Sequence, residues 1–477
     1  IRNVSRALFR ESEQLVSSYP VSYSAPERVL CLSNGHGEDV IAVRILEALQ
    51  KRSNPPELVA LPLVGEGQIY QQMGIPLIGP VKTMPSGGFI YMDGRQLARD
   101  LQGGLLQLTL NQFRTIRQWA KQGGSILAVG DIVPLLLAYL SGAPYAFVGT
   151  AKSEYYLRDE DGNLFPKTAL DGWSGSVYYP WERWLMSRPR CRAVFPRDRL
   201  TSETLQKWEI PAFDLGNPMM DGLEPRMLSR RPEPAVVGAM RPRQPEPAIA
   251  TATTVYRLVS WSRPDKPEAE PLSVLLLPGS RPPEAYENWQ LILQAVDGLI
   301  QATGAESELT FFGAIAPTLD LETLAYWLQR HGWQLQPSLS PSEAHGLDRV
   351  DAQALQFKQH HATLILTQRA FAECLHLADW AIAMAGTATE QFVGLGKPAI
   401  IMPGQGPQFT YAFAEAQTRL LGPSVTLVDH PAAVAPTLLT LQQHPDRLEA
   451  IAQNGYRRMG TAGAATRIAD CLMTQLK

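Results

Sequence analysis

The chain has 477 residues, of which 45% are hydrophobic, and a formal net charge of −3. Such a length favours two or three domains over one, and the nearly balanced charge gives no reason to expect a nucleic-acid partner. The four cysteines lie far apart, which argues against a zinc site or disulfide framework and favours a reducing compartment. The longest apolar tract, 126–148, contains Asp131, Pro134 and Pro144, so it suits buried strands and a helix better than a membrane span.

Residues 1–26 are predicted to form an amphipathic helix ahead of the first domain. Two regions of alternating strands and helices follow, at 27–223 and from 271 onward. Between them, 224–270 is rich in Pro, Arg, Ala and Thr, and we interpret it as a linker or surface insertion. Alternation of this kind predicts parallel sheets with helices on both faces. The predicted fold class is therefore α/β, with two Rossmann-like domains that face a cleft and bind ligands at the carboxyl ends of their sheets.

Apolar runs bounded by turn residues set the predicted elements of both regions. In the first region we expect strands at 29–33, 58–63, 125–130 and 145–149, with a loop at 34–39 and a helix at 40–50. In the second region we expect strands at 273–278, 309–312, 363–366, 380–383, 399–402 and 425–428, with a helix at 284–301. Residues from 431 onward are predicted to be helical.

The segment 384–404 is the most informative part of the sequence. An apolar strand runs into a small-residue turn at Gly386, and a short helix follows until Gly396 and Pro398 stop it. A strand that enters a helix through such a turn directs free backbone N–H groups outward, and these hold anions such as a diphosphate. The residues that could bind the anion, a ribose or a sugar are Gly386, Thr387, Ala388, Thr389, Glu390 and Gln391.

A second motif, Leu277-Pro278-Gly279-Ser280-Arg281, ends the first strand of the second region. It is not a Walker loop, because no Gly-Lys-Ser or Gly-Lys-Thr follows. Arg281 could grip a diphosphate with two N–H groups, or it could be a solvated arginine at a helix start. Further along, the amides of Gln408 and Gln417 could contact a nucleobase or sugar hydroxyls, or they could belong to a polar helix face.

In the first region, the loop Asn34-Gly35-His36-Gly37-Glu38-Asp39 follows the first strand directly. Its two glycines let the backbone approach a ligand closely, but it lacks the third glycine of a dinucleotide fingerprint. We interpret it as a ligand-binding loop in which His36, Glu38 or Asp39 handles a proton. The alternative is a tight turn in which Glu38 and Asp39 only favour the start of a helix.

Asp131 stands at another strand end of the first region, between an apolar strand and an apolar helix. It could cap that helix, and it could also act as a general base, since an apolar cleft raises the basicity of a carboxylate. The run Asp159-Glu160-Asp161-Gly162-Asn163 might suggest a metal site, but Asp161-Gly162 is typical of a hairpin turn, which we favour. No metal site is predicted.

Aromatic residues at 178–184 precede arginines at 188, 190, 192, 197 and 199. Aromatic side chains beside clustered arginines are typical of contact with a membrane interface that contains anionic lipids. A core helix with a charged rim is the alternative.

Four motifs together resemble the lipid-A-disaccharide synthase family: Gly-Asp-x-x-Pro at 130–134, Leu-Pro-Gly-Ser-Arg at 277–281, Ala-Gly-Thr-Ala-Thr at 385–389 and Gly-Leu-Gly-Lys-Pro at 394–398. The related proteins of cyanobacteria and plants look most similar, over about 28–222 and 271–475. The resemblance implies the GT-B fold, with an acceptor domain at 27–223, a nucleotide-sugar domain at 271–440, and helices at 441–477 that cross back to the first domain.

The resemblance also implies an activity. Members of the family are inverting, metal-independent glycosyltransferases that need no cofactor and move N-acylglucosamine from a UDP-sugar to a lipid-linked sugar phosphate at the inner membrane surface. Arg281, Thr387, Thr389, Glu390 and Gln391 would hold the UDP-sugar, and Asp131 would stand where the family has an essential aspartate. We therefore expect a cytoplasmic protein with a lipid-linked acceptor and peripheral membrane contact.

The sequence departs from the family on the acceptor side. The family's first loop usually reads Gly-Glu-x-Ser-Gly-Asp, where this chain has the acceptor-side loop 34–39, and Leu135 and Leu136 replace a usual aspartate and phenylalanine. The acceptor lipid and the transferred hexose or hexosamine stay open. Two other functions are compatible with the same fold: a UDP-sugar epimerase or hydrolase, and a non-catalytic protein that binds the nucleotide sugar.

Overall fold

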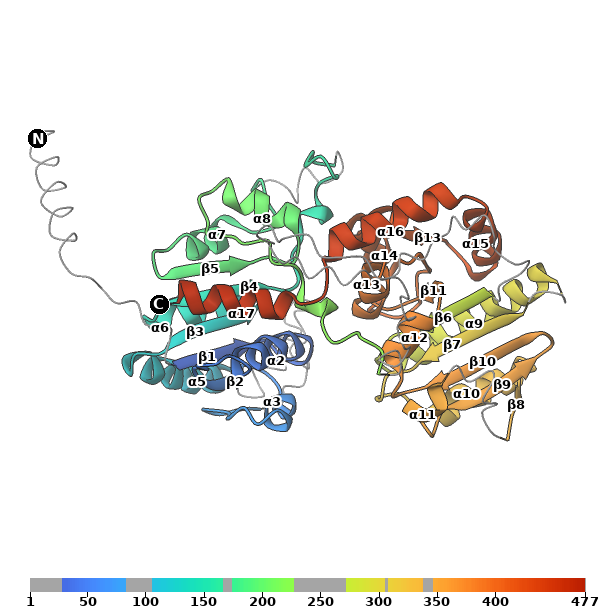
Figure 1. Cartoon of the computed structure of the whole chain (residues 1–477), viewed down its shortest axis with the longest axis horizontal. Helices are drawn as coiled ribbons and strands as arrows, with labels where there is room; N and C mark the ends of the chain where they lie inside the picture. Colours follow the sequence, from blue (N-terminus) through green and yellow to red (C-terminus); the bar gives the residue numbers. More distant parts are fainter. Residues whose placement is uncertain are drawn as a thin grey trace, which may run out of the picture.

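The structure is a computed structural model that describes residues 28–82, 105–165, 174–226, 272–304, 308–337 and 346–476. The predicted helix at 1–26 and most of the predicted linker at 224–270 lie outside the described residues. Two α/β domains stand next to each other along the long axis of the molecule (Figure 1). No helix among the described residues is long and apolar enough to cross a membrane.

The amino-terminal domain is built on a five-stranded sheet with the order β2-β1-β3-β4-β5, in which every pair is parallel. Because the strand order reverses between β1 and β3, their carboxyl ends form the switch point where such sheets bind ligands. The strands are β1 (Arg28–Ser33), β2 (Glu57–Pro62), β3 (Ser125–Gly130), β4 (Tyr145–Gly149) and β5 (Cys191–Phe195). The helices are α2 (His36–Gln50), α3 (Gln68–Gln72), α5 (Leu105–Lys121), α6 (Ile132–Ser141), α7 (Pro180–Met186) and α8 (Arg199–Gln206).

The carboxyl-terminal domain has an eight-stranded sheet with the order β13-β12-β11-β6-β7-β10-β9-β8, in which only β9 and β8 run antiparallel to their neighbours. Its switch point lies between β6 and β11. The strands are β6 (Leu272–Leu277), β7 (Leu309–Ala314), β8 (Gln334–Leu335), β9 (Leu355–Gln359), β10 (Ala362–Thr367), β11 (Trp380–Ala383), β12 (Ala399–Ile401) and β13 (Val425–Leu427). The helices are α9 (Glu284–Thr303), α10 (Leu321–Arg330), α11 (Leu347–Val350), α12 (Phe371–Leu377), α13 (Thr387–Gly394), α14 (Tyr411–Leu421), α15 (Val434–Gln442) and α16 (Pro445–Met459).

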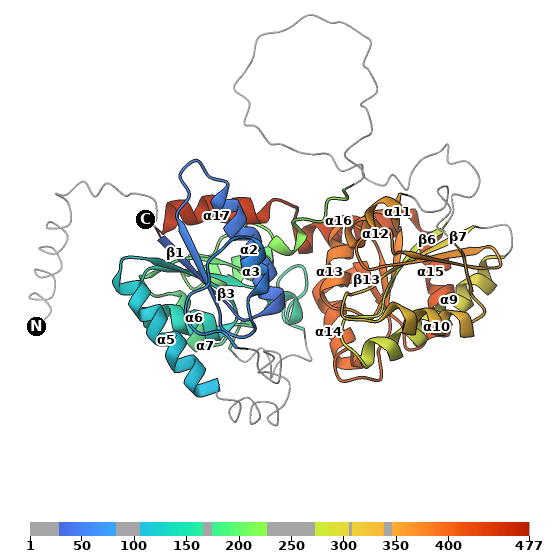
Figure 2. The same ribbon diagram turned by 90° about the horizontal axis from the view of Figure 1, so that it is seen from below.

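The last helix, α17 (Ala464–Gln475), returns to the amino-terminal domain and packs against α2 (Figures 1 and 2). Its residues Ile468 and Leu472 are buried in the same apolar cluster as β1 and α2, and each stabilises the fold by about 1.5–3 kcal/mol. Asp221, after the short helix η3 (Pro218–Met220), accepts hydrogen bonds from the N–H groups of Ala464 (3.1 Å) and Ala465 (2.7 Å) and so caps α17. The predicted two-domain α/β fold with a returning carboxyl-terminal helix is confirmed.

The predicted elements need correction at two points. The helix after β1 begins at His36 rather than at residue 40, because Gly35 ends the strand with a φ of 133° and the acidic residues that follow suit a first helical turn. The strands β5, β8 and β9 were not predicted, because β5 is a short apolar run between arginines and the other two are rich in polar residues. Elsewhere the predicted strands lie within two residues of the observed ones.

Candidate functional site

At each switch point the segments that follow two strands pack directly on one another, and we call these two regions crevices because open α/β sheets bind ligands there. A Cβ atom placed on Gly130, at the end of β3, would lie 3.0 Å from the Asn34 side chain in the loop after β1. A Cβ atom on Gly279, after β6, would lie 3.2 Å from the carbonyl oxygen of Met384, after β11. Both glycines have positive φ angles, 134° and 98°, which side chains rarely adopt. The predicted site residues therefore gather in two places, one on each domain.

In the carboxyl-terminal domain, the loop after β12 is fastened to the start of α9. Glu284, the first residue of α9, is buried and accepts hydrogen bonds from the backbone N–H groups of Gln408 (2.9 Å) and Phe409 (2.6 Å). The predicted Gln408 thus contributes its backbone to the loop, while its side chain is partly exposed. This arrangement places residues 402–410 beside the crevice between β6 and β11.

The predicted ligand-binding side chains of α13 are engaged within the protein. Thr389 Oγ1 donates to the carbonyl oxygen of Ala385 (2.6 Å), one turn back in the chain. Gln391 Nε2 donates to the carbonyl oxygen of Met219 (2.9 Å), in the connection between the domains. These side chains therefore hold the helix in position instead of projecting into the crevice.

What α13 offers to the crevice is its backbone. No side chain among the described residues caps the N-terminus of α13, which begins at Thr387 after Gly386. Thr387 is exposed and Ala388 half-buried, so the first N–H groups stand at the surface of the crevice. Across the β6–β11 switch point lie Ser280, which is exposed, and Arg281, which is half-buried. An uncapped helix N-terminus is an arrangement that binds anions, and Arg281 follows the neighbouring strand end.

Two buried amide oxygens at this crevice lack a hydrogen-bond partner among the described residues, namely Asn288 Oδ1 and Gln417 Oε1. Both residues are 2% exposed. Their nitrogen atoms are engaged: Asn288 Nδ2 donates to the carbonyl oxygen of Pro278 (3.0 Å), and Gln417 Nε2 donates to those of Ala385 (3.2 Å) and Gly386 (3.3 Å). Buried acceptors are rarely left unsatisfied, so these two oxygens are candidates for hydrogen bonds from donors that the described part of the chain does not supply.

In the amino-terminal domain, two carboxylates stand at the β1–β3 switch point. Asp131 Oδ1 accepts a hydrogen bond from the N–H of Val133 (2.9 Å) and caps α6, as one of the two predicted roles requires. The carboxylate of Glu38, in the first turn of α2, accepts hydrogen bonds from its own backbone N–H and, at 3.4 Å, from Thr150 Oγ1. Burial, reinforced by the charges of Asp131 and Asp39, raises the pKa of Glu38 above its ordinary value. The Glu38 carboxylate is thus more basic than an ordinary glutamate.

The other residues of the acceptor-side loop support it. Asp39 is buried and accepts a hydrogen bond from Ser33 Oγ (2.6 Å), which in turn accepts one from the Tyr70 hydroxyl (2.7 Å). Gly37 has open space around its α-carbon, whereas a Cβ atom on Gly35 would lie 3.3 Å from the backbone of the next loop. His36 begins α2, and its side chain lies outside the described structure.

Arg197 belongs to the interface between the crevices, although sequence reasoning gave it no role there. It follows β5 and is 6% exposed. Its Nη2 donates to Glu390 Oε2 on α13 (2.6 Å), and its Nη1 donates to the Thr150 carbonyl oxygen (3.3 Å). Although burial opposes a charge, the Glu390 carboxylate raises the pKa of Arg197 above its ordinary value. The run Phe195-Pro196-Arg197 is a strand end followed by arginine, like 277–281, and this likeness was the available signal.

The Gly-Leu-Gly-Lys-Pro motif serves the scaffold. Lys397 is buried, and its Nζ donates to the carbonyl oxygens of Leu375 (2.9 Å), His376 (2.7 Å) and Ala378 (2.5 Å) at the end of α12. Burial lowers the pKa of Lys397 to about 8. A cation at a helix C-terminus compensates the carbonyl groups there, so this lysine fixes α12 beside β11.

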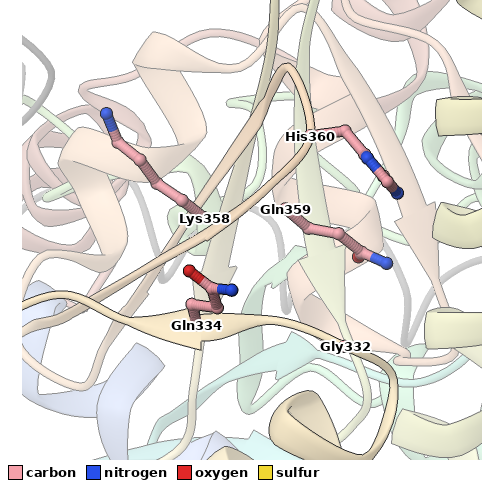
Figure 3. A pocket seen from close by; sticks show the side chains of 5 residues that line it. All are labelled: Gly332, Gln334, Lys358, Gln359 and His360. Atoms are coloured by element: carbon pink, nitrogen blue, oxygen red, sulfur yellow. The ribbon is translucent and has the colours of Figure 1, made fainter.

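Two other features lie apart from the crevices. A pocket of about 450 Å³ is lined by Gly332, Gln334, Lys358, Gln359 and His360 (Figure 3). It lies at the turn between β9 and β10, at the opposite end of the strands from the β6–β11 crevice. Within the described ranges no cluster of three His, Cys, Asp or Glu side chains could hold a metal ion. The predicted turn at 159–163 is confirmed, because Asp159 accepts hydrogen bonds from the N–H groups of Asp161 (3.1 Å) and Asn163 (2.8 Å).

The helices α6 and α7 pack together (Figure 2), and they and the residue before α7 carry an exposed apolar surface. We call it the α6–α7 surface; its members are Leu136 (41% exposed), Leu140 (46%), Tyr179 (38%), Trp181 (51%) and Trp184 (46%). Arginines accompany it: the Arg188 guanidinium lies 4.5 Å above the Trp184 ring, and that of Arg190 lies 5.3 Å above the Tyr139 ring. Large apolar side chains grouped in this way mark an interaction surface.

No family model matches the chain, and no curated protein matches it in sequence. Among solved structures, MurG of Acinetobacter baumannii is similar, with a TM-score of 0.51 and 13% identity over 94% of this chain and 100% of that chain. UDP-GlcNAc 2-epimerase of Neisseria meningitidis bound to UDP-GlcNAc gives a TM-score of 0.47 and 15% identity over 94% and 100%. The glycotransferase of kitacinnamycin gives 0.47 and 14% over 95% and 100%. At these identities the similarity to MurG concerns the fold, and it supports the two-domain α/β architecture of this chain.

Proposed function

We propose that the protein is an inverting glycosyltransferase that moves a hexosamine or hexose from a UDP-sugar to a lipid-linked acceptor at a membrane surface. The observation that carries this proposal is the β6–β11 crevice. It combines the uncapped N-terminus of α13, the Arg281 guanidinium and two buried acceptor oxygens without partners. A nucleoside diphosphate sugar supplies the matching groups, namely a dianionic diphosphate and several N–H and O–H donors.

On the donor side, the N–H groups of Thr387, Ala388 and Thr389 and the Arg281 side chain would hold the diphosphate. As the sugar leaves, negative charge grows on the terminal phosphate, and donors already directed toward it lower the barrier. Asn288 Oδ1 and Gln417 Oε1 are buried acceptors suited to hydrogen-bond donors of the nucleoside or sugar. Gly279 lets the β6 loop approach the bound diphosphate closely.

On the acceptor side, Glu38 would take the proton from the attacking hydroxyl. Its raised pKa makes it a better base near neutral pH than an ordinary carboxylate, and Asp131 keeps the loop ordered by capping α6. An acceptor bound to the amino-terminal domain would attack a sugar held by the carboxyl-terminal domain from the face opposite the leaving diphosphate. Such an attack would invert the configuration at the anomeric carbon.

The α6–α7 surface is our candidate for the membrane contact. Asp131 caps α6 at the acceptor-side crevice, and Leu136 and Leu140 lie one and two turns further along the same helix. Tryptophans partition to the bilayer interface, and Arg188 and Arg190 would pair with anionic headgroups. A protein bound through this surface would hold its acceptor-side crevice close to a lipid-linked substrate.

A thermal-shift panel of UDP, UDP-N-acetylglucosamine, UDP-glucose and GDP-mannose tests the proposal. Binding to the folded state raises the melting temperature, so UDP compounds should raise it and the GDP compound should not. Incubation of the stabilising UDP-sugar with and without lipid extract then identifies the reaction. Epimerisation or rapid hydrolysis without lipid would establish the epimerase or hydrolase alternative, and binding with no turnover under either condition would favour a non-catalytic protein.

A further inference from the structure

Arg197 joins the two domains at the place where their crevices meet. Its guanidinium, buried after β5, pairs with Glu390 of α13 at 2.6 Å. The same group donates a second hydrogen bond to the Thr150 carbonyl oxygen, at the end of β4. One side chain therefore holds the helix that begins at the donor-side crevice and a strand end of the acceptor-side domain.

Thr150 extends this connection to the acceptor-side carboxylate. Its N–H donates to the carbonyl oxygen of Gly130 (3.3 Å), directly before Asp131. Its hydroxyl donates to Glu38 Oε1 (3.4 Å). The contacts Glu390–Arg197–Thr150–Glu38 thus form a continuous polar path from α13 to the proposed base. A displacement of α13 changes the position of the Arg197 guanidinium, and the Thr150 backbone follows because it shares that guanidinium.

A second arginine between the domains shows what a purely structural contact looks like. Arg458 of α16 donates its Nε to Glu160 (2.8 Å) and its Nη1 to the carbonyl oxygens of Arg419 (2.6 Å) and Leu420 (2.7 Å). It anchors the loop after β4 to the carboxyl-terminal domain, but none of its contacts reaches a strand end of either switch point. Arg458 therefore serves as a matched control for Arg197.

We propose that Arg197 is a positioning residue that couples nucleotide-sugar binding on the carboxyl-terminal domain to the acceptor-side carboxylate Glu38 on the amino-terminal domain. The inference rests on the proposed function, because the ligand at the N-terminus of α13 is taken to be a UDP-sugar. A ligand that binds at the N-terminus of α13 favours the position of α13 in which its contacts form. Because Glu390 belongs to α13, the Glu390–Arg197 ion pair carries this change of position to Arg197. Donor binding would then order the acceptor side before the acceptor arrives.

Hydrogen exchange of the full chain, with and without UDP-N-acetylglucosamine or UDP, measures this coupling without needing an acceptor. In the wild type, the ligand should slow exchange in 385–391 and also, by about fivefold or more, in 147–152. Arg197→Met should keep the first effect and lose the second, whereas Arg458→Met should keep both. Two outcomes overturn the coupling. In the first, the ligand slows exchange in 385–391 of the wild type but not in 147–152. In the second, the ligand slows exchange in 147–152 equally in the wild type and in Arg197→Met.

The remaining outcome concerns the proposed function itself. If neither UDP compound changes exchange anywhere in the chain, the nucleotide-sugar site is refuted and the coupling falls with it. If the coupling alone fails, the UDP compounds still slow hydrogen exchange in 385–391, so the two results can be told apart.

Two further variants separate the effect of the Arg197 hydrogen bonds on coupling from their effect on the stability of the fold. Arg197→Lys keeps a positive charge beside Glu390 but lacks the planar fork that reaches Thr150 at the same time, so coupling should be partly restored. The double variant Arg197→Glu with Glu390→Arg restores an ion pair between the domains but gives residue 197 no hydrogen-bond donor for the Thr150 carbonyl oxygen. We expect the double variant to recover the melting temperature lost in Arg197→Met and not the response of 147–152. Full recovery of that response would show that the ion pair alone suffices and would overturn the role of the path.

Discussion

The two switch-point crevices are built in opposite ways. In the carboxyl-terminal domain, the side chains of Thr389 and Gln391 and the amide nitrogen of Gln417 form internal hydrogen bonds. The crevice presents the backbone N–H groups of α13 and two buried amide oxygens. In the amino-terminal domain, Asp39 and Asp131 are engaged in the scaffold, whereas Glu38 keeps a carboxylate with only a long side-chain contact. One crevice is suited to hold a charged group without changing it, and the other to exchange a proton.

The largest effect is expected at the proton-handling crevice. Glu38→Gln should lower kcat by about 10²–10⁴-fold, the usual contribution of a general base, and kcat/KM of the wild type should rise with pH through the raised pKa of Glu38. Because the folded state holds this proton more tightly than the unfolded state, ionisation of Glu38 costs stability, fully so above its folded pKa. Glu38→Gln should therefore melt at a higher temperature at pH 8. If Glu38→Gln keeps the kcat of the wild type, Glu38 is not the general base.

The anion-holding crevice is tested at Arg281. Arg281→Met should weaken UDP binding by about 10–100-fold, since hydrogen bonds to charged groups contribute about 1.5–3 kcal/mol each. Arg330→Met on α10, an exposed arginine that contacts Tyr326 (3.2 Å), is the control and should bind UDP normally. Isothermal titration with UDP compares the two variants, and equal affinities would show that Arg281 lies outside the nucleotide site.

Lys397 tests the boundary between crevice and scaffold. Lys397→Met removes three hydrogen bonds from the end of α12 and should lower the free energy of unfolding by about 2 kcal/mol. Denaturant unfolding measures this loss, and UDP affinity should stay unchanged in the same preparation. A selective loss of UDP binding with normal stability would move the lysine from the scaffold into the nucleotide site.

The smallest effect is expected at the α6–α7 surface. Replacing Trp181 and Trp184 together by serine should lower binding to vesicles of phosphatidylglycerol and phosphatidylcholine by about tenfold, because each exposed ring would lose its partition into the interface. The double variant Tyr326→Ser with Leu335→Ser, on the carboxyl-terminal domain, is the matched control. Equal vesicle binding by all three proteins in a sedimentation assay would contradict the proposed membrane contact.

The sequence was a good guide to the fold because most strands are apolar runs ended by Gly, Pro or polar residues. It was a poorer guide to which side chains face a ligand. Thr389, Glu390 and Gln391 have the groups that bind sugars, yet the structure directs Thr389 to its own helix turn and the other two across the domain boundary. Such partners lie 170 or more residues away in the chain, as Gln391 and Met219 show with a separation of 172, and no local pattern reveals them.

Arg197 shows the same limit from the other side. Its neighbours in sequence are charged, so it read as one member of a basic cluster at 188–199. Only the parallel pairing of β4 with β5 brings it beside Thr150, and only the docking of the second domain supplies Glu390. Roles that depend on two non-local contacts at once require the assembled structure.

The return of α17 has a consequence for the order in which the protein is made. The sheet of the amino-terminal domain leaves the ribosome before the carboxyl-terminal domain, but part of its apolar cluster comes from Ala465, Ile468 and Leu472, which are synthesised after the carboxyl-terminal domain. Until then, α2 has an uncovered apolar face that is open to aggregation or to chaperones. The amino-terminal domain is therefore completed only after the carboxyl-terminal domain has been made, and a ribosome that stalls between α16 and α17 leaves the amino-terminal domain unfinished.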